Sequence, residues 1–133
     1  MGQPAARQND PVMGTDVHIV MVPSAGGPVP TPLPHVFSGR LQGALSFDVL
    51  IDGLPAAVVG SVAVNVPPHL PTPPGTAFQA PPRNQGSVQV GSAIVLINGK
   101  GAARVGDQVL TCNDPIDQPV GTITAGSPTV LVG

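Results

Sequence analysis

The chain has 133 residues, among them 17 Gly and 18 Pro, with five basic and seven acidic side chains and neither Trp nor Tyr. A formal net charge of −2 excludes the basic surface that nucleic acid or an anionic membrane requires. A hydrophobic fraction of 41 %, mostly Val, Ile, Leu and Ala, excludes a disordered chain in spite of the Pro and Gly content. We expect one small domain over residues 1–133, made in the cytoplasm because no signal sequence opens the chain.

Two further features bear on the core and on membranes. Cys112 is the only cysteine, so no internal disulfide can form. Residues 54–82 carry no charged side chain, yet the prolines between Pro55 and Pro74 exclude a continuous membrane-spanning helix there. An aliphatic core without Trp or Tyr is thin, so we expect an additional stabilising element such as a bound metal.

The predicted elements are short strands, because Gly or Pro interrupts almost every window of ten residues and excludes long helices. Runs of Val, Ile and Leu predict strands at 16–21, 47–51, 58–66, 87–90, 93–97, 103–109, 122–124 and 129–132. Two Pro-rich segments, 23–45 and 67–86, are predicted to be irregular connectors that are stiff and not mobile. In the first of them, Pro28–Pro34 favours an extended polyproline conformation.

An internal repeat organises these strands. Residues 49–61, VLIDGLPAAVVGS, return 46 residues later as residues 95–107, VLINGKGAARVGD, with eight of thirteen positions identical. A shorter copy opens the chain at residues 2–10, and a fragment closes it at residues 126–133. Each copy is one supersecondary unit that cannot bury its apolar face alone, so we expect the copies to pack around one axis.

Each full copy contains the signal for a hairpin turn. Asp52-Gly53 and Asn98-Gly99 each lie between two strand-like runs, and these pairs favour a two-residue turn with positive φ at both positions. The predicted fold class is therefore all-β. It is a small cone of three β-hairpin repeats, near residues 2–18, 49–69 and 93–112, with pseudo-threefold symmetry and long Pro/Gly-rich connectors.

A potential metal ligand follows each copy at a similar distance. His18 and His69 each lie 14 residues after the Pro that begins Pro-Ala-Ala, and Cys112 lies 11 residues after the Gly at the matching position. Three hairpins around one axis would bring these side chains to one point, where His35 can supply a fourth ligand. The predicted site is a tetrahedral set that suits Zn²⁺, with iron as the alternative. Its members are His18, His35, His69 and Cys112.

The sequence favours a structural site over a catalytic one. Four protein ligands leave no open coordination position, so we expect no enzymatic activity. The alternative is a zinc hydrolase, which would use three of these ligands, an open position and a general base. Asp10 and Asp107 occupy matching repeat positions, where Ser61 stands in the second copy. They are interpreted as turn caps or as partners of Arg7 and Arg104.

The repeats resemble those of the PAAR family, named for Pro-Ala-Ala-Arg. The likeness lies in Pro4-Ala5-Ala6-Arg7, Leu54-Pro55-Ala56-Ala57-Val58, Gly101-Ala102-Ala103-Arg104-Val105-Gly106-Asp107 and Gly126-Ser127-Pro128-Thr129-Val130-Leu131. It covers nearly the whole chain apart from the two connectors. Two departures are visible, because Val58 stands in place of Arg in the second copy and Gly101 in place of Pro in the third.

The resemblance implies a spike-tip protein. Family members form a small cone with a metal, usually zinc, held near the apex by three His and one Cys. The base sits on a trimeric β-helical spike of the VgrG type, one tip chain per trimer, in type VI secretion systems and phage-tail-like contractile injection systems. The cone sharpens the spike for puncturing a target membrane, and the particle carries it out of the cell or into the target. An adaptor that docks effector cargo onto the spike is the alternative.

Overall fold

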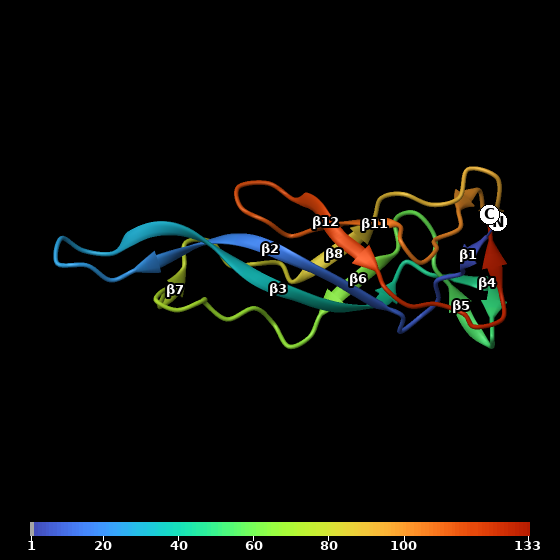
Figure 1. The fold of residues 1–133 in the computed structure, drawn as a ribbon, viewed down its shortest axis with the longest axis horizontal. Helices are drawn as coiled ribbons and strands as arrows, with labels where there is room; N and C mark the ends of the chain where they lie inside the picture. Colours follow the sequence, from blue (N-terminus) through green and yellow to red (C-terminus); the bar gives the residue numbers. More distant parts are fainter. Residues whose placement is uncertain (1) are drawn as a thin grey trace.

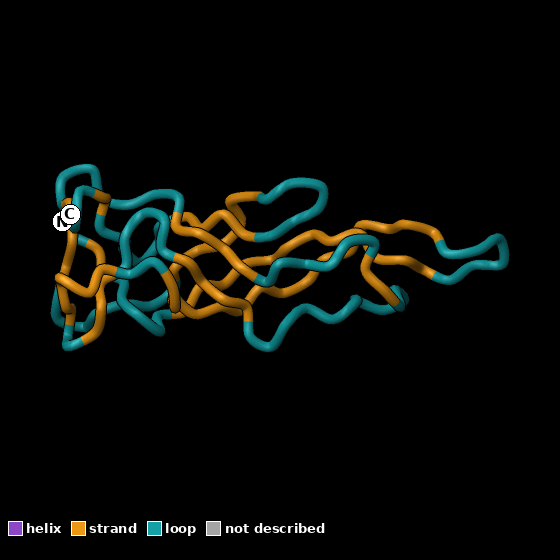
Figure 2. The backbone as a smooth tube through the Cα atoms, turned by 180° about the vertical axis from the view of Figure 1, so that it is seen from behind, coloured by secondary structure: helices purple, strands orange, loops and turns teal. Residues whose placement is uncertain are grey.

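The computed structural model describes residues 2–133 as an elongated all-β molecule (Figure 1). Both chain ends lie at one end of the long axis, and the turn of the longest hairpin lies at the other (Figure 1, Figure 2). These residues form no helix, and therefore none of a length and apolarity that would cross a membrane. The strands are β1 (Gln3–Pro4), β2 (Pro11–Val22), β3 (Val29–Gly43), β4 (Ser46–Ile51), β5 (Leu54–Ala56), β6 (Val62–Asn65), β7 (Ala77–Phe78), β8 (Gln85–Val88), β9 (Leu96–Ile97), β10 (Lys100–Gly101), β11 (Gln108–Thr111), β12 (Gln118–Ile123) and β13 (Leu131–Val132).

Six strands of the largest sheet close on themselves. They follow the order β12-β11-β8-β6-β3-β2, and β12 also pairs with β2. All of these pairings are antiparallel. The closed sheet surrounds a small core in which Val12, Phe37, Leu41, Val109 and Ile123 are fully buried. The predicted all-β fold class is confirmed, and closure of the sheet gives a core with few aromatic residues an enclosed volume to fill.

The longest hairpin corrects part of the prediction. β2 and β3 pair continuously from Pro11 opposite Arg40 to Val22 opposite Val29. The irregular connector predicted over residues 23–45 is therefore wrong, because most of that segment is a strand. The strands predicted near 58–66 and 103–109 are shorter than expected, since turns precede both β6 and β11.

Prolines in β3 made the strand hard to predict, and they lie at its outer edge. Val66 N donates to Ser38 O, and Thr72 Oγ1 donates to Pro34 O. The even-numbered residues of this part of β3 therefore turn their backbone groups away from β2. The prolines at such positions are Pro30, Pro32 and Pro34. The missing N–H of each proline costs no hydrogen bond with β2, so the strand tolerates all three.

Three short hairpins lie at the end that holds the chain termini (Figure 1). β4 and β5 turn at Asp52-Gly53 with φ of 52° and 80°, and β9 and β10 turn at Asn98-Gly99 with φ of 53° and 78°. The predicted two-residue turns are confirmed. The third hairpin is β13 paired with β1. The opening copy of the repeat and the closing fragment thus pair as the two strands of a hairpin do, although they come from opposite parts of the sequence.

The Ala-Ala segments of the three copies form a ring of backbone hydrogen bonds. Ala6 N donates to Ala103 O over 2.9 Å, while Ala57 N donates to Ala6 O and Ala103 N to Ala57 O over 3.0 Å each. All three alanines are at most 1 % exposed. Each copy thus bonds to the next in cyclic order, which is the predicted pseudo-threefold arrangement. A side chain as small as Ala lets the three backbones approach one axis.

We expect Ala57→Leu to destabilise the fold, because a larger side chain at the axis must separate the three backbones. The free energy of unfolding should fall by about 2–3 kcal/mol in a urea titration. Ala80→Leu, at an exposed loop position, is the matched control and should change it by less than about 0.5 kcal/mol. Equal stability of the two variants would contradict a tightly packed axis.

Each Ala-Ala segment is followed by a turn that one side chain caps. The donor is in each copy the backbone N–H three residues before the capping side chain. Arg7 N and Arg104 N donate over 2.7 Å to carboxylate oxygens of Asp10 and Asp107, and Val58 N donates over 2.9 Å to Ser61 Oγ. The guanidinium groups of Arg7 and Arg104 also pair with the two carboxylates. The interpretation as turn caps and ion-pair partners is confirmed, and Ser61 performs the capping role in the second copy.

Candidate metal centre

Four buried side chains meet where β2, β11 and the segment after β6 come together. Asp16 and His18 lie on one face of β2, because they are two residues apart in a strand. Cys112 directly follows β11, and His69 follows a Pro-Pro pair beyond the end of β6. Their exposed fractions lie between 0 and 8 %. One potential ligand atom from each lies within 4.8 Å of all the others.

The distances within this cluster approach those around a single metal ion. Asp16 Oδ2 lies 2.8 Å from His69 Nε2 and 3.5 Å from Cys112 Sγ. His18 Nε2 lies 3.6 Å from Cys112 Sγ and 3.9 Å from Asp16 Oδ2. A tetrahedral ion with bonds of about 2.0–2.3 Å separates its ligands by roughly 3.3–3.8 Å. Small side-chain shifts would therefore suffice to place all four donors on one ion.

His35 lies beside the cluster, but its ring nitrogens face backbone groups. Its Nε2 accepts a hydrogen bond from Thr72 N over 3.1 Å, and its Nδ1 lies 2.9 Å from Leu33 O. The imidazole centroids of His18, His35 and His69 form a triangle with sides of 5.0, 5.4 and 5.5 Å. The structure thus brings all three predicted histidines together, although His35 directs neither nitrogen at the other donors.

Asp16 is the cluster member that the sequence interpretation missed. Its Oδ1 accepts hydrogen bonds from Thr111 Oγ1 and from Asn113 Nδ2, the second over 3.3 Å, and Oδ2 is left to face the other donors. The available signal was its position two residues before His18. Alternating residues of one strand share a face, so a ligand at His18 places Asp16 on the same side.

The ionisable groups of the cluster shift one another's pKa values. Burial alone would raise the pKa of Asp16, but hydrogen bonds with two histidines and Thr111 lower it to about 2. Burial opposes the positive charge of His18, yet hydrogen bonds with Asp16 and Cys112 raise its pKa to about 10. Burial likewise disfavours the Cys112 thiolate, but the histidines lower the pKa of the thiol to about 7. A carboxylate and a readily ionised thiol among imidazoles form a donor set that suits a divalent cation.

His18 also has an acidic neighbour on its other side. Its Nδ1 is buried without a hydrogen-bond partner within residues 2–133, and it lies 3.4 Å from Asp114 Oδ2. A metal-bound imidazole commonly directs its second N–H at a carboxylate. With Nε2 in the cluster and Nδ1 toward Asp114, the ring is placed as a metal ligand would be. The donor set and this nitrogen together fit a bound ion.

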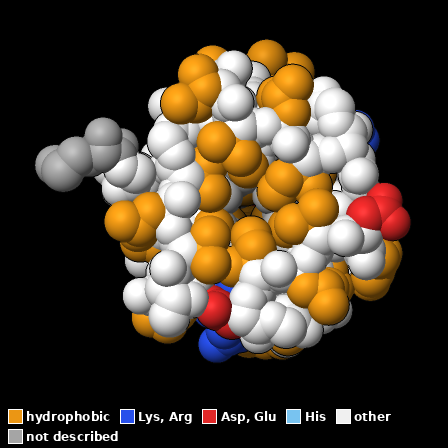
Figure 3. Space-filling model, turned by 90° about the vertical axis from the view of Figure 1, so that its right-hand side faces the viewer, with side chains coloured by type: hydrophobic (Ala, Val, Ile, Leu, Met, Phe, Trp, Pro, Cys, Tyr) orange, Lys and Arg blue, Asp and Glu red, His pale blue; other side chains and the backbone are white. Residues whose placement is uncertain are grey.

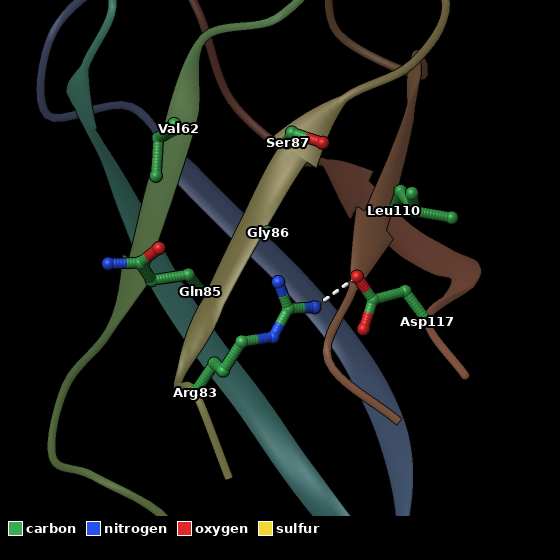
Figure 4. Close-up of a pocket in the computed structure, with 7 residues that line it drawn as sticks. All are labelled: Val62, Arg83, Gln85, Gly86, Ser87, Leu110 and Asp117. Carbon is green, nitrogen blue, oxygen red and sulfur yellow. Dashed lines mark hydrogen bonds and ion pairs between the residues drawn. The ribbon is translucent and has the colours of Figure 1, made fainter. Parts of the chain in front are cut away.

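The cavities of the surface leave most of the donor set enclosed. A groove of about 420 Å³ is lined in part by His69 of the cluster and by the neighbouring His35. Asp16, His18 and Cys112 do not line it. A smaller pocket of about 70 Å³ lies apart from the cluster, beside the ion pair of Arg83 and Asp117 (Figure 4). A buried set of four donors is the geometry of a structural metal site, whereas a catalytic one keeps a position open to substrate.

The fold and the cluster define a class of protein: a small β-hairpin cone built around a threefold axis, with buried Asp, His and Cys donors that could hold a metal. Residues 78–133 match the family model described as PAAR motif, which confirms the resemblance to PAAR-repeat proteins over that part of the chain. The matched part contains the third copy, Cys112 and β13. No curated protein matches the chain. The motif supports a spike-tip protein of contractile injection systems, a structural class that sits on VgrG spikes.

Proposed function

We propose that this chain caps the blunt end of a trimeric β-helical spike of the VgrG type, one chain per trimer, and sharpens it for penetration of a target membrane. The observation that carries the proposal is the cyclic order of hydrogen bonds between the three Ala-Ala segments. A threefold partner needs contacts that repeat three times around its axis, and this single chain supplies them. The PAAR motif over residues 78–133 supports the same role.

The hairpin end of the molecule offers the docking surface. Leu50, Leu96 and Leu131 occupy equivalent positions on β4, β9 and β13, and they are 59, 61 and 64 % exposed. Figure 3 views the molecule from this end and shows apolar side chains spread over it among few charged groups. One exposed leucine per hairpin suits a partner that presents the same apolar contact three times. The hairpins also bring strands to cover the open strand ends of a β-helical spike.

The second part of the proposal is a structural metal, zinc first and iron as the alternative, held by His18, His69, Cys112 and Asp16. The mutual distances and the unpartnered His18 Nδ1 support this set. His35 is the alternative fourth ligand, because a tetrahedral ion spaces imidazole centroids roughly 5 Å apart, as they are here. A bound ion would join three separate parts of the chain, so its binding free energy would stabilise the fold.

Two matched variants decide whether Asp16 or His35 is the fourth ligand of the metal. We expect Asp16→Asn to weaken metal binding at least about tenfold, because a neutral amide is a poorer ligand than a carboxylate. His35→Ala should retain the full metal content. Metal per chain is measured by mass spectrometry of the element after competition with a chelator. The reverse result would assign the fourth position to His35, and full retention by both variants would contradict either set.

The proposed function is tested by co-expression with a trimeric spike protein. We expect the two to co-purify as one tip chain per trimer, with one metal ion in the complex. Separate elution of chain and spike would contradict the role of the chain as a cap. A complex with the expected stoichiometry but no metal would leave that role intact and contradict the metal site alone.

A further inference from the structure

Charged side chains are distributed unevenly along the molecule. Residues 17–39 and 66–82 contain no Asp, Glu, Lys or Arg. These segments build the end opposite to the chain termini, where β7 pairs with Val20 and Met21 of β2 (Figure 1). The histidines within them are at most 8 % exposed. The far end of the β2–β3 hairpin, residues 19–33 and here called the apex hairpin, therefore has an uncharged surface.

The side chains that this end exposes are mostly apolar. Val29 in the apex hairpin is 47 % exposed, while Val36 and Leu70, which lie outside residues 19–33, are 66 and 80 % exposed. The prolines of the hairpin turn and of the first half of β3 are also exposed. The polar groups at the very tip are neutral, in the sequence Ser24-Ala-Gly-Gly27. Burial of such a surface in a hydrocarbon environment would desolvate no charge.

The two outer strand edges at this end expose few unpaired backbone donors. The outer edge of β2 is covered: Met21 O and Ile19 O accept from Thr76 N and Gln79 N, and Ile19 N donates to Asp114 Oδ2, each over 2.9 Å. The outer edge of β3 lacks three N–H groups where its prolines stand. An unpaired N–H is costly in hydrocarbon, where no water can accept from it. The apex hairpin thus avoids two of the main costs of leaving water.

A belt of polar and charged groups marks where this end begins. Asn113 and Asp114 bond through their side chains to the backbone of Val17 and Ile19. The ion pair of Arg83 with Asp117 joins the start of β8 to the same loop (Figure 4). Beyond Ile19, the strand continues to Val22 for about 10 Å, and the turn adds a few Å. This reach of roughly 15 Å is half of the ~30 Å hydrocarbon core of a bilayer.

We propose that the apex hairpin enters the hydrocarbon of the outer leaflet of the target bilayer while the charged belt stays among the headgroups. The inference rests on the proposed tip role, and it adds which part of the tip meets the membrane and by what kind of contact. The contact is apolar and not electrostatic, so it does not depend on anionic lipid. A charged side chain within the apex hairpin would raise the cost of entry, since charge is expensive in the bilayer interior.

The test uses a single introduced Trp as reporter, because the chain contains neither Trp nor Tyr. Ala25→Trp places the reporter in the turn of the apex hairpin, and Phe47→Trp places the control on β4 at the opposite end; both positions are exposed. With phosphatidylcholine vesicles, we expect a blue shift of emission for Ala25→Trp and quenching by lipids brominated on their acyl chains. Phe47→Trp should show neither effect.

A matched pair of charge variants tests whether the absence of charge in the apex hairpin allows it to enter the bilayer. Val29→Asp, added to the Ala25→Trp reporter, should weaken partitioning by about tenfold, because it brings a carboxylate into the apex hairpin. Val90→Asp, at a position 42 % exposed compared with 47 % for Val29, should leave partitioning unchanged. An unchanged emission of Ala25→Trp, a response only to anionic vesicles, or equal effects of the two aspartates would each overturn the inference. Co-purification of the Ala25→Trp variant with the spike tests the tip role separately.

Discussion

Replacement of His18 by Ala is expected to remove the metal and to lower the free energy of unfolding by about 3–5 kcal/mol. His18 is 1 % exposed, and its Nε2 faces both Cys112 and Asp16. Without the ring, a buried carboxylate and a thiol would lose a partner that compensates their charge. For a chain of this length, the melting temperature should fall by about 10–20 °C. Thermal unfolding followed by circular dichroism measures this shift.

The control separates loss of metal from loss of packing. Val20→Ala lies two residues further along β2 and also truncates a fully buried side chain. It should lower the melting temperature while the protein still responds to a chelator. The His18→Ala protein should no longer respond, because its metal is already absent. The metal hypothesis would be refuted by an unmodified protein that contains no metal and melts at the same temperature with and without chelator.

Replacement of Leu96 by Asp should strongly weaken docking on the spike. Leu96 is 61 % exposed on β9, next to the buried Ile97, so Leu96→Asp changes the surface without opening the core. Docking would then lose the burial of a leucine and gain a desolvated charge. We expect the affinity for the trimeric spike to fall at least about a hundredfold in surface plasmon resonance.

Leu70→Asp is the matched control for this experiment. Leu70 is 80 % exposed, in the uncharged segment that accompanies the apex hairpin. Its replacement should leave both spike affinity and melting temperature unchanged. If Leu96→Asp binds like the unmodified chain, the leucines of the hairpins are not the docking surface. A loss of affinity with Leu70→Asp alone would place the interface on the side of the molecule.

Features with a local cause could be predicted from the sequence. A turn such as Asn98-Gly99 depends on the conformational preferences of its own two residues. The sequence therefore predicted both two-residue turns correctly. The cyclic arrangement followed from repetition, because equal segments must bury equal faces. The positions of His18, His69 and Cys112 followed from the same register, which explains how residues far apart in the sequence could be assigned to one place.

Features that depend on a neighbouring strand could not be predicted in this way. β3 contains prolines that locally favour an extended but unpaired chain, and only the pairing with β2 shows that their missing N–H groups lie at the outer edge. Asp16 was missed because repeat register does not mark it. Its role depends on burial and on the donors Thr111 and Asn113, which lie almost a hundred residues away in the sequence.

The pairing of β1 with β13 gives this fold a circular order of elements. This pair has the register of the other two hairpins, since Gln3 stands opposite Val132 as Leu54 stands opposite Ile51. A permuted chain, joined from Gly133 to Gly2 and opened between Asn98 and Gly99, would keep every strand pair. The strand order of this fold therefore does not depend on which of the three strand pairs is left without a turn.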